Sequence, residues 1–193
     1  TDGSGVIDDI TISAGSTTGT VNFTPTNDSV YEGNETAIIA ISSVTGEASE
    51  SGTQAVTITI TDNESAPTVT LTTSATSIAE NAGSSLTITA TLSTATTADV
   101  TVTIGTAGTA TEGTDYTDGS GNLDDITISA GSTTGTVSFT PTDDASDPVY
   151  EENETAVISI DGVSGGSASE SGSQSVTITI TENESAPTVT LAR

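Results

Sequence analysis

The chain has 193 residues, of which 27 are acidic and only one, Arg193, is basic, so its formal net charge is −26. A field of this sign makes nucleic acid and anionic membrane surfaces poor partners, because both need basic patches, and we expect no nucleic acid to bind. The absence of Cys and His excludes disulfides and leaves zinc and copper without their preferred ligands. No apolar run reaches the roughly 18 residues of a membrane-spanning helix, so we expect no direct membrane insertion.

The sequence contains a tandem repeat of a whole folding unit. Residues 1–26 and 117–142 are nearly identical, and so are residues 49–71 and 169–191. Self-similarity at a long period is typical of repeat arrays. We therefore predict the C-terminal part of one repeat at 1–66, a complete repeat at 67–186 and the first strand of a following repeat at 187–193.

Apolar residues alternate with Thr and Ser along the complete repeat. This period of two, with β-branched residues on both faces, predicts half-buried antiparallel strands, and no segment has a helical period. About seven strands in about 120 residues fit an all-β sandwich of two sheets. The predicted strands are, in chain order, 67–71, 86–92, 100–104, 126–128, 137–139, 156–160 and 176–180.

The first repeat is expected to be incomplete. Thr1 matches Thr117, so the counterparts of residues 68–116, which carry the first three strands, do not precede it. Residues 1–66 should not close a sandwich alone, because the missing strands leave open sheet edges. Two explanations stay open: the chain ends ignore domain boundaries, or strands from another copy complete the unit.

Acidic residues gather at the predicted strand ends. If consecutive strands run antiparallel, alternate ends meet at one pole of the sandwich, where converging carboxylates destabilise the fold unless cations lie among them. Calcium suits such a site because it takes about six to eight oxygen ligands in flexible geometry. We predict a calcium site there, with a solvated acidic loop as the alternative. The candidate ligands are Glu80, Asp115, Asp143, Asp144, Glu151, Glu154, Glu182 and Glu184, with Asp28, Glu32, Glu35, Asp62 and Glu64 in the first repeat.

The order of the motifs resembles the Calx-β domain. The segments that carry the resemblance are SIAENAG, GTATEGTDYT, DDITISAGSTTGTVSFTPTDD, YEENETAVISI and VTITITENE. The resemblance implies tandem immunoglobulin-like antiparallel β-sandwiches, and calcium ligands at the positions of Glu80, Asp115, Asp143 with Asp144, Glu151 with Glu154, and Glu182 with Glu184. Two departures bear on the number of ions: the insertion at Ala145–Asp147, and Asn183, which interrupts the last acids.

Together these features predict a structural segment rather than an enzyme. The chain has no His, Cys or Lys to act as base or nucleophile, and few aromatic residues to bind sugars. We expect an extracellular, cell-surface repeat that binds calcium and serves as a rigid spacer or filament segment of a large adhesin-like protein. Its expected partners are neighbouring repeats of the same chain and other copies of itself.

Alternative functions stay open at this point. One is an adhesion module that binds a ligand or itself, including fibres assembled by strands shared between chains. Another is a halophilic protein whose acidity maintains solubility. Asn34 and Asn153 each begin a NET triplet, the N-glycosylation sequon, which arises readily by chance in a Thr-rich chain.

Overall fold

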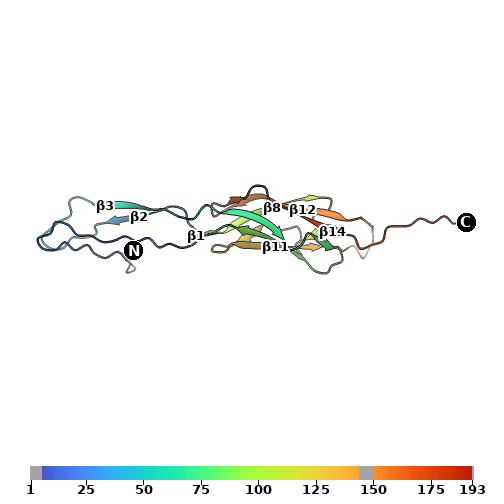
Figure 1. The fold of residues 1–193 in the computed structure, drawn as a ribbon, viewed down its shortest axis with the longest axis horizontal. Coiled ribbons are helices and arrows are strands. Elements are labelled where there is room, and N and C mark those ends of the chain that lie inside the picture. The colour runs from blue at the N-terminus through green and yellow to red at the C-terminus, as the bar shows by residue number, and fades with distance from the viewer. Residues whose placement is uncertain (1–5, 144–149, 193) are drawn as a thin grey trace. The chain divides into compact units, whose positions relative to one another are not determined.

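The computed structural model describes residues 6–143 and 150–192. Their backbone divides into two compact units (Figure 1). The first unit comprises the chain up to Ser29 together with Gly33–Asp62, and the second comprises Val30–Glu32 together with the chain from Asn63 onward.

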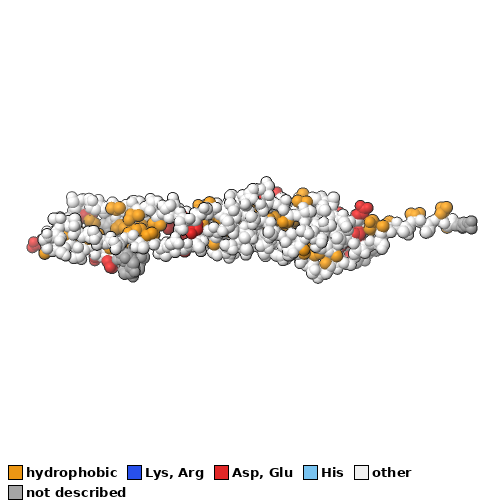
Figure 2. All heavy atoms as spheres, in the orientation of Figure 1, with side chains coloured by type: hydrophobic (Ala, Val, Ile, Leu, Met, Phe, Trp, Pro, Cys, Tyr) orange, Lys and Arg blue, Asp and Glu red, His pale blue; other side chains and the backbone are white. Residues whose placement is uncertain are grey.

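The first unit contains one two-stranded sheet, in which β2 (Glu35–Ala40) pairs antiparallel with β3 (Ala55–Ile60). Much of its apolar surface is open, and Figure 2 shows hydrophobic side chains at its surface. Ile10 and Ile12 are 54% and 57% exposed, whereas their counterparts in the second repeat, Ile126 and Ile128, are buried. Among the described residues, the two-stranded sheet of the first unit has no counterpart of the strands β4 (Thr68–Thr73), β6 (Leu86–Leu92) and β8 (Val100–Gly108) that surround Ile126 and Ile128 in the second unit.

The second unit is a β-sandwich of two five-stranded sheets, with strand orders β10-β8-β12-β14-β5 and β13-β4-β6-β11-β9. The prediction of an all-β sandwich is confirmed, and no described residue is helical. A separate parallel pair joins β1 to β7. The bounds are β1 (Val30–Tyr31), β4 (Thr68–Thr73), β5 (Ser77–Ala79), β6 (Leu86–Leu92), β7 (Ala95–Thr96), β8 (Val100–Gly108), β9 (Tyr116–Thr117), β10 (Ile126–Ile128), β11 (Thr134–Pro141), β12 (Glu154–Ser164), β13 (Ser169–Glu170) and β14 (Ser175–Thr181).

The seven strands predicted from alternation are β4, β6, β8, β10, β11, β12 and β14. In β12, for example, Ala156, Ile158 and Ile160 are buried while Val157 and Ser159 between them are not. β12 is the central strand of its sheet and pairs antiparallel with both β8 and β14. Period-two alternation therefore specified both the strands and the face that each turns to the core.

Two edge strands join in parallel, which the sequence did not predict. β5 lies beside β14, and β13 lies beside β4. The chain leaves β4 in one sheet and enters β5 in the other after a short link, so it changes sheets without reversing direction. As a result, β5 and β14 end at the same pole of the sandwich, and the acidic residues that follow them meet there.

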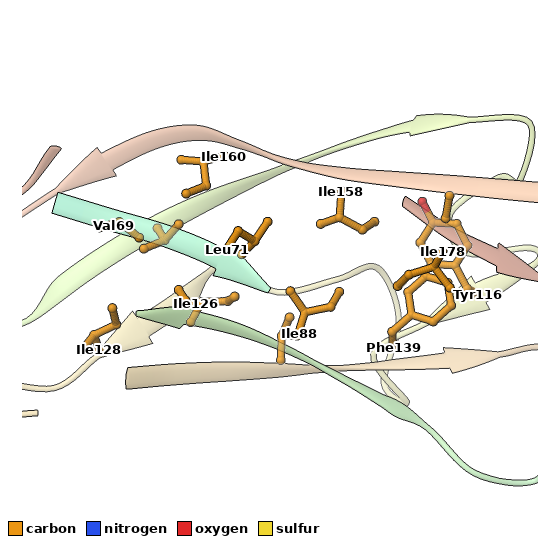
Figure 3. Packing of buried hydrophobic residues seen from close by; sticks show 14 of the residues in the cluster. Val69, Leu71, Ile88, Tyr116, Ile126, Ile128, Phe139, Ile158, Ile160 and Ile178 are labelled. Carbon is orange, nitrogen blue, oxygen red and sulfur yellow. The ribbon is translucent and has the colours of Figure 1, made fainter. Parts of the chain in front are cut away.

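The core between the sheets is built from Ile, Val and Leu with two aromatic rings (Figure 3). The rings of Tyr116 and Phe139 stack with centroids 4.6 Å apart and an interplanar angle of 21°. Both side chains are fully buried, and this burial raises the pKa of the Tyr116 phenol. Because Tyr116 directly follows Asp115, its burial anchors that carboxylate at the edge of the core.

Candidate metal centre

Six carboxylates form two groups at one pole of the second unit. Asp115, Glu151 and Glu154 make one group, and Glu80, Glu182 and Glu184 make the other. Within each group, one carboxylate oxygen from every residue lies within 4.8 Å of the others. A pocket at this pole is lined by Glu80, Asp115, Thr142, Glu151, Glu152, Glu154, Ile180 and Glu182.

The strand pairing places the second group. Thr181 pairs with Ala79 at the end of the β14–β5 ladder, and the N–H of Glu80 donates to the Thr181 carbonyl at 3.0 Å. Glu80 and Glu182 therefore leave adjacent strand ends in the same direction. Since these ladder bonds belong to the fold itself, the two carboxylates are brought together without any ion.

A sharp turn after β8 places Asp115. Gly108 has a φ of 118°, and a Cβ at this position would lie 2.0 Å from the Thr155 carbonyl oxygen, so only glycine fits. The following amides of Thr109 and Ala110 both donate to that carbonyl, at 2.9 and 3.0 Å. The loop then closes on Asp115, whose Oδ2 accepts the Thr111 N–H at 2.6 Å.

Glu154 carries the clearest electrostatic signature of the pole. Burial, followed by the nearby negative charge of Asp115, raises the pKa of the Glu154 carboxyl from 4.5 to about 7. Glu151 and Glu182 act in the same direction. Between about pH 4.5 and 7 the folded protein thus holds a proton on Glu154 that an unfolded chain would lose. A cation bound among these oxygens would offset the repulsion between the carboxylates more fully than the proton does.

The pKa of the Glu182 carboxyl is shifted in the opposite direction, downward. Its Oε1 accepts the N–H groups of Asn183 and Glu184 at 2.8 and 2.9 Å, and its Oε2 accepts the Glu151 N–H at 2.6 Å. These backbone donors, with that of Glu184 first, lower the pKa of the Glu182 carboxyl to about 2. Glu182 therefore stays ionised and connects the loop before β12 to the loop after β14.

The predicted ligands of the second repeat are thus largely brought together. Six of the eight lie in the two groups. Asp143 is exposed and lies in neither of them, although the N–H of the preceding Thr142 donates to the Asp115 carbonyl at 2.9 Å. Asp144 and the insertion at residues 145–147 lie outside the described residues.

The predicted ligands of the first repeat behave differently. No three of them form a comparable group within residues 6–143 and 150–192, and Glu80 and Asp115 have no first-repeat counterparts in the chain. Asp62, the counterpart of Glu182, accepts the Gly33 N–H at 2.6 Å. The residues concerned are Asp28, Glu32, Glu35, Asp62 and Glu64.

Two features of the pole escaped the sequence analysis. The Oδ1 of Asn153 accepts the Glu182 N–H at 3.0 Å, although its NET triplet indicated only a sequon. Glu152 has a φ of 71°, in the left-handed region that disfavours side chains, and its counterpart Gly33 has a φ of 74°. The Gly at this position in the first repeat was the one available signal.

A family model for the Calx-beta domain matches residues 2–64 and 62–184. The chain belongs to the Calx-beta domain family. The resemblance drawn from the motifs is therefore confirmed, and the acidic groups accord with a family whose domains bind calcium and occur in the extracellular parts of surface proteins. No curated protein matches this Calx-beta chain.

The oxygen-only donor set fits calcium chemically. Each group offers three carboxylates, and calcium completes its shell of about six to eight oxygens with further carboxylate oxygens, backbone carbonyls or water. As regards membranes, none of the described residues belong to a helix long and apolar enough to cross a bilayer.

The raised pKa of Glu154 predicts a pH dependence of stability in the absence of calcium. Between about pH 4.5 and 7 the folded state binds a proton more tightly than the unfolded state, so the free energy of unfolding should fall as the pH rises through this window. Below about pH 4.5 the lowered pKa of Glu182 should reverse the trend, since its stabilising effect is lost as the pH falls toward 2.

The measurement is thermal unfolding in chelator across both windows. Glu154→Gln should flatten the fall in the free energy of unfolding between about pH 4.5 and 7, because the glutamine cannot take up the proton. Asp161→Asn is the matched control: it removes one charge from the same strand, roughly 23 Å further along, and should leave the fall intact. An equal fall in wild type and Glu154→Gln would contradict the assignment.

The backbone of Glu152 predicts a stabilising substitution. Glu152→Gly relieves the left-handed strain but also removes a charge, so Glu152→Gln, which removes only the charge, is the reference. We expect the glycine variant to be more stable than the glutamine variant by about 1 kcal/mol in urea unfolding, after the cost of added freedom in the unfolded chain. A glycine variant less stable than the glutamine variant would show that this φ is not strained.

Proposed function

We propose that this Calx-beta chain is a calcium-binding structural repeat, a rigid spacer or filament segment of a large adhesin-like protein at the cell surface, and not an enzyme. The observation that carries the proposal is the pair of three-carboxylate groups at the pole of the second unit. With one basic residue in the whole chain, ion pairs offer these groups almost no compensation.

The mechanism is mass action on a repulsive cluster. An ion that binds the folded pole but not the unfolded chain stabilises the fold in proportion to the logarithm of its concentration. Each group draws on segments far apart in sequence: one joins Asp115 to the start of β12, and the other joins the end of β5 to the end of β14. An ion in either group would therefore hold separate strand ends together and stiffen this pole of the sandwich.

The residues at the pole support binding and not catalysis. Glu154 holds a proton in the absence of a cation and would release it on ion binding, since a ligand carboxylate must be ionised. Glu182 stays ionised through its backbone donors and offers its charge without reorganisation. The titratable side chains that line the pocket are all acids, and the chain offers no His, Cys or Lys with which a carboxylate would form a nucleophile–base pair.

A second candidate, a self-associating adhesion module, is supported by a different observation. In the first unit Val56, which is 61% exposed, pairs with Ile39 on one face of the β2–β3 sheet, and Ile38 on the other face is 70% exposed. Exposed apolar surface of this kind is typical of a protein interface. Sedimentation of the full chain as a dimer or larger species would favour this candidate, and a monomer would favour the spacer alone.

Calcium should raise the melting temperature. At a free calcium concentration of about 100 times the dissociation constant, we expect a rise of roughly 5–10 °C for one site, reversed by chelator. Magnesium should act more weakly, because it demands a tighter octahedral shell and keeps its waters. The measurement is thermal unfolding followed by circular dichroism.

Two controls make this test specific. Asp115→Asn should reduce the response to calcium, whereas Asp161→Asn should retain it. Potassium chloride at matched ionic strength separates ion binding from general screening, which a halophilic protein would need. An equal rise with potassium chloride and with calcium would contradict the proposed function.

A further inference from the structure

A reciprocal pair of hydrogen bonds joins the two acidic loops of the second unit. The Oδ1 of Asn153 accepts the Glu182 N–H at 3.0 Å, and the Oε2 of Glu182 accepts the Glu151 N–H at 2.6 Å. The first loop carries Glu151 and Glu154, and the second carries Glu182 and Glu184. We refer to this pair of bonds as the clasp.

The first unit contains the same clasp, built from different residues. The Oδ1 of Asn34 accepts the Asp62 N–H at 3.0 Å, and the Oδ2 of Asp62 accepts the Gly33 N–H at 2.6 Å. Gly33 corresponds to Glu152. The bond that the Asp62 carboxylate accepts therefore comes from an amide one residue nearer the following strand than the bond that Glu182 accepts in the second unit. The shorter Asp side chain reaches the nearer amide, and the longer Glu reaches the next one.

The clasp lies where the strand pairing ends. The β12–β14 ladder ends at the pair Glu154–Ile180, and beyond it the two ligand-bearing segments continue without backbone pairing to each other. Their carboxylates repel one another, which favours separation of the loops. An asparagine at position 153 accepts the Glu182 amide as an aspartate would, but adds no further negative charge to the pole.

We propose that Asn153 is a positioning residue for the metal centre, which holds the loop of Glu151 and Glu154 against the loop of Glu182 and Glu184 before an ion binds. This inference rests on the proposed calcium function. Outer hydrogen-bond partners of this kind commonly change metal affinity by about 10–100-fold when they are removed. The NET triplet at Asn153 thus has a structural use of its own, independent of glycosylation.

The test compares Asn153→Ala, Asn153→Asp and wild type in the full chain, by calorimetric titration with calcium and by amide hydrogen exchange in chelator. Asn153→Ala should weaken calcium binding about 10-fold and speed exchange of the Glu182 amide, while its melting temperature in chelator falls by no more than about 4 °C. Asn153→Asp keeps the acceptor, so it should keep slow exchange and bind calcium at least as tightly as wild type. Asn22→Ala, at an exposed position of the first unit outside both groups, is the control that should leave the calcium titration unchanged.

The outcomes separate the two proposals. A lower melting temperature in chelator with an unchanged calcium affinity for Asn153→Ala would show a merely structural residue and overturn the positioning role alone. Unchanged exchange of the Glu182 amide in that variant would overturn it too. Absence of calcium binding by wild type would overturn the proposed function, and the positioning role with it.

Discussion

Repulsion between carboxylates at the strand ends is the constraint on which the rest of this pole depends. The fold brings six of them into two groups, and the two best-defined members answer the repulsion differently. Burial and the neighbouring negative charges raise the pKa of Glu154 to about 7, so that it takes up a proton, while Glu182 keeps its charge by accepting backbone N–H groups. Neither response neutralises the whole cluster, and a divalent cation coordinated by several members at once would do so most completely.

The sandwich creates this constraint through its topology. Because β5 runs parallel to β14 after the chain changes sheets, Glu80 and Glu182 emerge side by side. Asp115 reaches the same pole because Tyr116 is stacked on Phe139 in the core and because Gly108 permits the turn after β8. Core packing therefore also determines where this ligand lies, and a substitution that loosens the Tyr116–Phe139 contact would also displace the Asp115 carboxylate.

The sequence predicted the fold well because alternation reports directly on burial. The seven main strands followed from period-two patterns, and antiparallel pairing led us to expect acids at one pole. The placing of Glu80 beside Glu182 depends instead on the parallel β5–β14 pair, which was not predicted. The edge strands β5 and β13 were missed because each has at most three residues, too few to show a period. The functions of Asn153 and Glu152 were missed for another reason: they depend on which backbone amides the register brings within reach, and on a local φ, which side-chain type alone does not reveal.

The most direct measurement is a crystal structure of the chain grown with calcium, with anomalous diffraction to identify the ion. An ion is expected among Asp115, Glu151 and Glu154, with carboxylate oxygens at roughly 2.3–2.6 Å, and a second ion among Glu80, Glu182 and Glu184. Carboxylates that diverge into solvent with no ion between them at millimolar calcium would contradict this role of calcium, because no bound cation would then hold the strand ends of this pole together.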